Sequence, residues 1–172
     1  MHFGARDCRV HRLVAQNYTL EHPNRDKASS KATRAVVILI LLVSVALFLI
    51  VTVGGWNALV GAQAMQIFYI AVYLVMAFYV GRWNRGVLPV IAALAIIMAI
   101  FAAVATPAWF DRDKPGFEDP ALASEILGLI TAIIVPVQVL LIAFAMRGFQ
   151  QAWNVEVERY SDGTTNAAPS PA

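Results

Sequence analysis

Residues 35–53 read AVVILILLVSVALFLIVTV, without an Asp, Glu, Lys, Arg or His. At about 1.5 Å of rise per residue, a helix of this length spans roughly the 30 Å hydrocarbon core of a bilayer. A soluble helix needs a polar face, and this segment has none. Three more uncharged apolar segments follow: Ala58–Val80, Val87–Ala105 and Ile126–Met146. The sequence therefore predicts an all-α integral membrane protein, a four-helix transmembrane bundle with up-down-up-down topology.

The composition agrees with this fold class. Hydrophobic residues make up 59% of the 172 residues and charged residues 14%, against roughly 25% charged residues in a soluble domain. No stretch outside the four segments is as long as an ordinary soluble domain. We therefore expect one bundle over residues 35–146, a basic tail over residues 1–34 and a second tail over residues 147–172.

The positive charges predict an orientation. The side that holds both tails and the 81–86 turn carries 11 of the 13 Lys and Arg residues, and the other side carries Arg112 and Lys114. Because cytoplasmic loops are enriched in Lys and Arg, both termini are expected in the cytoplasm, in a multi-pass protein of the cell membrane. The first apolar run begins only at Ala35, so it is expected to stay as a signal anchor rather than to be cleaved.

The tails are polar and are expected to be disordered. Residues 22–33 and 161–172 lack the apolar surface that would offset the entropy of ordering them. The first twenty residues leave two alternatives, a disordered basic tail or a basic helix on the membrane surface. The fourth helix is expected to continue through Arg147–Arg159, with Trp153 as an interfacial anchor.

Short connections constrain the order of the helices. The first connection, Gly54–Asn57, and the second, Gly81–Gly86, are only a few residues long. We therefore expect the first and second helices, and also the second and third, to be neighbours. Trp83 lies between two arginines in the second connection and is expected at the level of the lipid headgroups.

Two rows of small residues predict close helix packing. Such residues four apart form a groove where another backbone can approach. The rows are Ala95, Ala99 and Ala103 in the third segment, and Ser124, Gly128 and Ala132 in the fourth. They are expected to pack inside the bundle, and the alternative is that either row contacts a second copy.

A polar stripe follows one face of the second segment. It consists of Gln63, Gln66, Tyr69 and Tyr73, and the fourth segment adds Gln138. A glutamine facing lipid would leave its amide unsatisfied, so the stripe should face the bundle interior. Tyr73 and Gln138 lie at the same depth, about 22 Å along their helices, and we predict that they pair. The stripe either holds the bundle together or lines a path for a small molecule or ion.

No sequence pattern predicts chemistry. The four segments contain no carboxylate, Lys or His, and the three histidines lie in the N-terminal tail, so an intramembrane proton relay or haem ligation is not expected. Asp111, Asp113 and Gly116 match the start of a calcium loop, but Pro115 and Leu122 replace two ligands. We therefore expect no catalytic residue, no cofactor and no metal site.

These observations favour a non-enzymatic accessory, assembly or scaffold subunit that acts through helix–helix contacts. The alternative is a small transporter or channel subunit that works as an oligomer, with a path lined by the Gln/Tyr stripe. The expected partners are the lipid bilayer and other membrane proteins or further copies of the chain, and not nucleic acid. The alanine-rich segments and short loops are typical of bacterial inner-membrane proteins.

Overall fold

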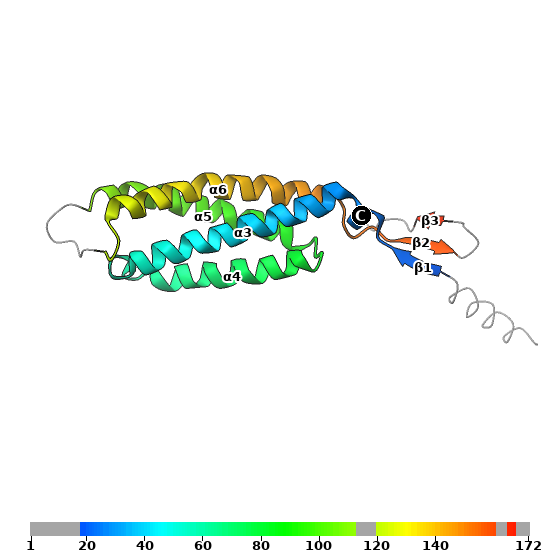
Figure 1. Ribbon diagram of the computed structural model, residues 1–172, viewed down its shortest axis with the longest axis horizontal. Coiled ribbons are helices and arrows are strands. Elements are labelled where there is room, and N and C mark those ends of the chain that lie inside the picture. The colour runs from blue at the N-terminus through cyan, green and yellow to red at the C-terminus, as the bar shows by residue number, and fades with distance from the viewer. Residues whose placement is uncertain (1–17, 113–119, 161–164, 168–172) are drawn as a thin grey trace, which may run out of the picture.

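Four long helices make up the body of the molecule (Figure 1). The computed structural model describes residues 18–112, 120–160 and 165–167. The long helices are α3 (Ala28–Gly54), α4 (Gln63–Gly81), α5 (Val87–Phe110) and α6 (Ser124–Gln150). Each is long and apolar enough to cross a membrane. This confirms the all-helical body that the apolar segments predict.

The helix boundaries differ from the expected ones where local chemistry overrides hydropathy. Helix α3 begins at Ala28 rather than Ala35, since alanine and lysine favour helix as well as apolar residues do. Helix α4 begins at Gln63 rather than Ala58. A 3-10 turn, η1 (Trp56–Leu59), precedes it, and Gly61 has a φ of 86° that breaks the helix.

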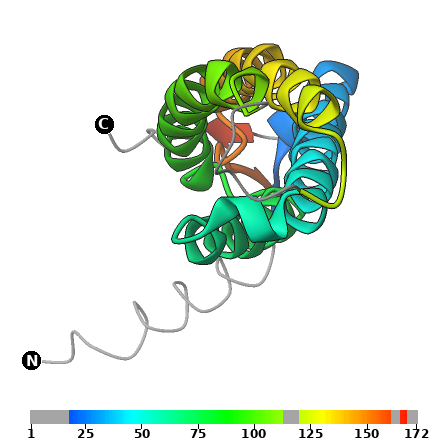
Figure 2. The same ribbon diagram turned by 90° about the vertical axis from the view of Figure 1, so that its left-hand side faces the viewer.

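The helices form a ring when seen from one end (Figure 2). Helix α3 packs against α4 and α6, and α5 packs mainly against α6. Of the pairs that are neighbours around this ring, α4 and α5 share the least contact, although the two are consecutive in the chain. The expectation that the second and third helices are neighbours is therefore confirmed, although their contact is much smaller than that between α5 and α6. The short turn joins their ends, while glycines on α6 draw α5 toward that helix instead.

The bundle core is a narrow apolar column, and large apolar side chains also cover the outside. Buried positions recur every three or four residues along each helix, as in α3 at Val37, Leu41, Ser44 and Phe48. Outside, side chains such as Phe68 and Ile100 are more than half exposed. A surface this apolar is unfavourable in water and is suited to lipid.

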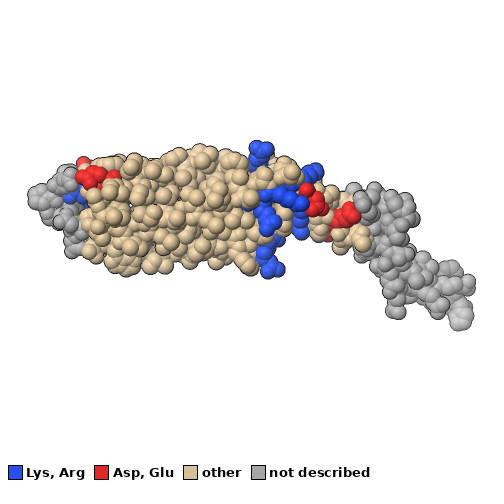
Figure 3. Space-filling view, in the orientation of Figure 1, with Lys and Arg blue, Asp and Glu red and all other residues tan. Residues whose placement is uncertain are grey.

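The two ends of the bundle differ in charge (Figure 3). Lys and Arg gather where α3 begins, α4 ends, α5 begins and α6 ends. We call this the basic end, and it carries Arg34, Arg82, Arg85 and Arg147. The other end, which we call the far end, holds Gly54, Trp109 and Ser124.

Parts of both tails are ordered beyond the basic end. Strands β1 (Tyr18–Glu21), β2 (Val157–Tyr160) and β3 (Thr165–Ala167) form an antiparallel sheet in that order, and the short helix α2 (Pro23–Asp26) follows β1. The expected disorder of residues 22–33 and 161–172 is therefore wrong for α2, for the start of α3 and for β3, because helix formation and strand pairing satisfy their backbone hydrogen bonds. The possible surface helix and most of the calcium-loop pattern lie outside the described residues.

Candidate functional site

A buried hydrogen-bond network joins three helices at the middle of the bundle. The Tyr73 hydroxyl of α4 donates to Oε1 of Gln138 of α6 at 2.8 Å. The Gln138 Nε2 atom donates in turn to Oγ of Ser44 of α3 at 3.1 Å. All three residues are 0% exposed. The predicted contact between Tyr73 and Gln138 is therefore confirmed, and it is direct.

Ser44 is the member of this network that sequence reasoning missed. Its hydroxyl donates to the carbonyl of Ile40, one turn earlier, at 2.8 Å. A serine in an apolar helix commonly makes that local bond, so nothing in the sequence signals a second role. The available clue is that Ser44 is the one polar residue within residues 35–51.

Aromatic rings surround the Tyr73 end of the network. The ring centroids of Phe48 and Tyr73 are 5.4 Å apart, and those of Tyr69 and Tyr73 are 5.9 Å apart. Both tyrosines are buried. The packing holds the Tyr73 ring in place, which fixes the direction of its hydroxyl toward Gln138.

The two remaining glutamines of the stripe behave differently from Gln138. Gln63 donates from Nε2 to the carbonyl of Trp56 at 2.9 Å, and so ties the start of α4 to η1. Gln66 is half-buried, and its Oε1 atom is buried without a hydrogen-bond partner. The stripe is thus not one continuous polar path, since its members have separate partners.

A cavity of about 440 Å³ lies toward the far end of the bundle. It touches all four long helices, and its lining includes Phe48, Gln66, Phe101, Trp109 and Thr131. The wall is mainly apolar. The largest share of its lining comes from α5, and Met65 and Gln66 contribute from α4, the ring neighbour with which α5 shares little contact.

The two rows of small residues are only partly used for packing within the chain. Gly128 is buried, and a Cβ atom placed on it would lie 2.9 Å from Phe110 and 3.1 Å from Trp109 of α5. Ser124 and Ala132 are half-buried. On α5, Ala95 is buried, Ala99 is half-buried and Ala103 is exposed. Since residues four apart drift by about 40° around a helix, the α5 row turns from the interior to the surface.

Arginine and tryptophan side chains close the basic end. The Arg34 guanidinium lies over the Trp83 ring, 4.5 Å from its centroid, and donates to the Gly81 carbonyl at 2.6 Å. Trp83 meets Trp153 edge to face at a centroid distance of 5.3 Å. Trp83 has a φ of 63°, which turns the chain sharply between α4 and α5.

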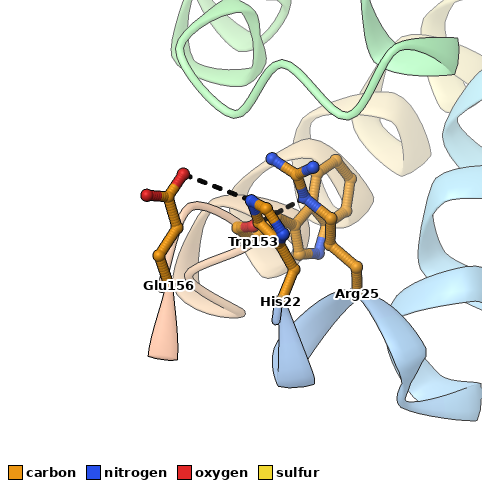
Figure 4. A network of polar contacts seen from close by, with 4 residues as sticks. All are labelled: His22, Arg25, Trp153 and Glu156. Carbon is orange, nitrogen blue, oxygen red and sulfur yellow. Dashed lines mark hydrogen bonds and ion pairs between the residues drawn. The ribbon is translucent and has the colours of Figure 1, made fainter. Parts of the chain in front are cut away.

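The two chain ends meet over this closure (Figure 4). His22 contacts the carboxylate of Glu156 at 3.2 Å, and Arg25 donates from Nε to the carbonyl of Trp153 at 3.0 Å. Trp153 is 0% exposed. The predicted continuation of the fourth helix through Arg147–Arg159 is wrong, because α6 ends at Gln150 and Ala152 has a φ of 48°, which turns the chain. Trp153, the predicted interfacial anchor, is buried beside this turn.

Among residues 18–112, 120–160 and 165–167, no three His, Cys, Asp or Glu side chains cluster closely enough to hold a metal ion. Comparison with protein-family models, with curated proteins and with solved structures finds no match to this chain.

Proposed function

We propose that this chain is a non-enzymatic integral membrane protein that serves as an accessory, assembly or scaffold subunit through helix–helix contacts. The observation that carries this proposal is the pairing at the centre of the bundle. Tyr73, Gln138 and Ser44 are fully buried and bond one another. A path for ions or polar solutes needs polar groups that face an open lumen. These three side chains bond one another instead of facing a lumen, which favours a packed structural bundle over a conducting pore.

The charged ends support a placement in the cell membrane, with the four helices running up-down-up-down. The basic end holds both ordered chain ends and the 81–86 turn. Under the positive-inside rule this end lies in the cytoplasm. The bundle then presents its exposed apolar side chains to lipid or to neighbouring helices.

The surface of α5 is the face best suited to a partner helix. Ala103 is exposed there although small residues in membrane helices commonly lie at contacts. A small side chain lets a second backbone approach, and the neighbouring Val104 offers an exposed apolar flank. We propose that this face contacts a second copy or another membrane protein.

Disulfide cross-linking in native membranes tests this face. In a Cys8→Ser background, Ala103→Cys is compared with Leu129→Cys, which is also exposed but lies on α6. Oxidation is expected to cross-link Ala103→Cys to the same position of a second copy, and to leave Leu129→Cys monomeric.

The transporter or channel alternative is tested with purified protein. The purified protein in liposomes is expected to pass no ions above the protein-free background. The absence of a cross-link at Ala103→Cys would contradict a second copy on this face. A flux that Tyr73→Phe abolishes would contradict the scaffold proposal and favour the alternative.

A further inference from the structure

The far-end cavity combines an apolar wall with one unsatisfied acceptor. Its volume of about 440 Å³ falls in the range of about 300–1,000 Å³ that is typical of small-molecule sites. Ring and aliphatic groups from all four long helices form the wall, including Phe48, Phe101 and Trp109. The Gln66 Oε1 atom is buried and accepts no hydrogen bond.

The one hydroxyl group among the lining residues, that of Thr131, already donates a hydrogen bond. Thr131 donates from Oγ1 to the Leu127 carbonyl at 2.7 Å. Among the described residues, none donates to Gln66 Oε1 in the structure, and a molecule in the cavity can supply that donor. Buried polar atoms are rarely left unpaired in folded proteins, so this acceptor calls for an explanation.

Two simple occupants fit the cavity poorly. A water molecule would satisfy Gln66, but a buried water normally makes two to four hydrogen bonds, and the rest of this wall is mainly apolar. A lipid acyl chain would fill the wall but would leave the acceptor unpaired. A molecule with an apolar carbon skeleton and one hydroxyl group would both pack against the apolar wall and donate to Gln66 Oε1.

We propose that this cavity binds a membrane-soluble apolar molecule through a hydroxyl group that donates to Gln66 Oε1. The carbon skeleton lies against α5 and beside Met65 of α4, two ring neighbours that pack loosely against each other. The molecule enters from the bilayer through the seam between them. This binding role goes beyond the accessory function and does not depend on it.

Two probes that differ at one phenolic oxygen test the proposal. They are p-bromophenol and p-bromoanisole, in which a methyl group replaces the hydroxyl hydrogen. Bromine quenches tryptophan fluorescence, and Trp109 lines the cavity. The purified protein in detergent is expected to show saturable quenching, with p-bromophenol binding about tenfold more tightly, the factor that one net hydrogen bond supplies.

A pair of matched variants assigns the donor preference to Gln66. Gln66→Met keeps the shape of the side chain but removes the acceptor, and it is expected to bind both probes with equal affinity. Gln63→Met removes a glutamine that is outside the cavity lining, and it is expected to keep the tenfold preference. A third variant, Ala105→Phe, places a ring at a lining position and should abolish saturable quenching by both probes.

Each opposite result overturns the proposal. Equal affinity of the wild type for the two probes would mean an acyl-chain cavity without hydroxyl recognition. A preference that survives in Gln66→Met would place the recognition elsewhere. Saturable binding that survives in Ala105→Phe, or no saturable quenching in the wild type, would also rule out this site. If Gln66→Met fails to fold by circular dichroism, the wild-type probe comparison and Ala105→Phe still decide.

Discussion

Tyr73, Gln138 and Ser44 give the bundle a directional contact that its apolar residues lack. Aliphatic side chains pack in many similar ways, whereas hydrogen bonds of 2.8 Å and 3.1 Å allow one register of α4, α6 and α3. A fully satisfied polar network of this kind specifies a unique core. The network therefore accounts for the three buried polar residues Ser44, Tyr73 and Gln138 of the long helices.

Removing the Tyr73 hydroxyl should weaken the bundle measurably. Tyr73→Phe leaves Gln138 Oε1 without its donor, and the expected loss is about 0.6–1.7 kcal/mol of unfolding free energy, as for other hydrogen bonds between membrane helices. The matched control is Tyr79→Phe on the same helix, since Tyr79 is 43% exposed. Unfolding in mixed micelles measures both variants. A double-mutant cycle with Gln138→Leu that shows no coupling energy would contradict the account.

The sequence predicted the Tyr73–Gln138 contact because depth along two helices can be counted. The sequence did not predict that Gln66, a member of the same stripe, has no hydrogen-bond partner for its Oε1 atom. Whether a glutamine finds a partner depends on the rotation of each helix and on the neighbours that this brings close. Neither hydropathy nor residue spacing predicts that rotation or those neighbours.

At the level of helices, glycine decides which pairs pack closely. Gly128 brings α6 against Phe110 and Trp109 of α5, and Gly148 brings it within 3.2 Å of Leu88, measured from a Cβ placed on each glycine. Helix α4 has no such glycine facing α5, since a Cβ on Gly81 would meet nothing within 4 Å. The result is a tight α5–α6 pair and a loose α4–α5 seam.

A bulky side chain at Gly128 should therefore separate α5 from α6. Gly128→Leu is expected to cost about 1–3 kcal/mol of stability, the usual penalty for overpacking a filled site. Leu140→Phe is the control, because Leu140 is 52% exposed on the same helix. Thermal unfolding in detergent compares the two. An unchanged Tm for Gly128→Leu would show that the contact contributes nothing to packing.

The four helices were predictable because long uncharged segments leave no other stable arrangement in a bilayer. How closely each pair of neighbours packs was not predictable. A short turn restrains only the ends of two helices, and the packing of their bodies follows side-chain volume, as the α4–α5 seam shows. The row Ala95, Ala99 and Ala103 misled for a related reason, since a strict spacing of four drifts around the helix.

For the whole molecule, the main feature is the closure of the basic end by both chain ends. Arg25 binds the Trp153 carbonyl, Asn24 donates to the Ala152 carbonyl at 3.0 Å, and β1 pairs with β2. These contacts join residues that are more than a hundred positions apart in the chain. Sequence analysis missed them, because each segment alone is short and polar, and its partner comes near only after the four helices have assembled.

The central claim is that the bundle spans the membrane with its basic end in the cytoplasm. Asn84 in the 81–86 turn and Asn57 at the far end are both exposed, which makes them matched positions for labelling. In a Cys8→Ser background, each is replaced by cysteine, and intact cells are treated with a membrane-impermeant maleimide. The account predicts that Asn57→Cys reacts in intact cells and that Asn84→Cys reacts only after permeabilisation. Reaction of Asn84→Cys in intact cells would contradict it.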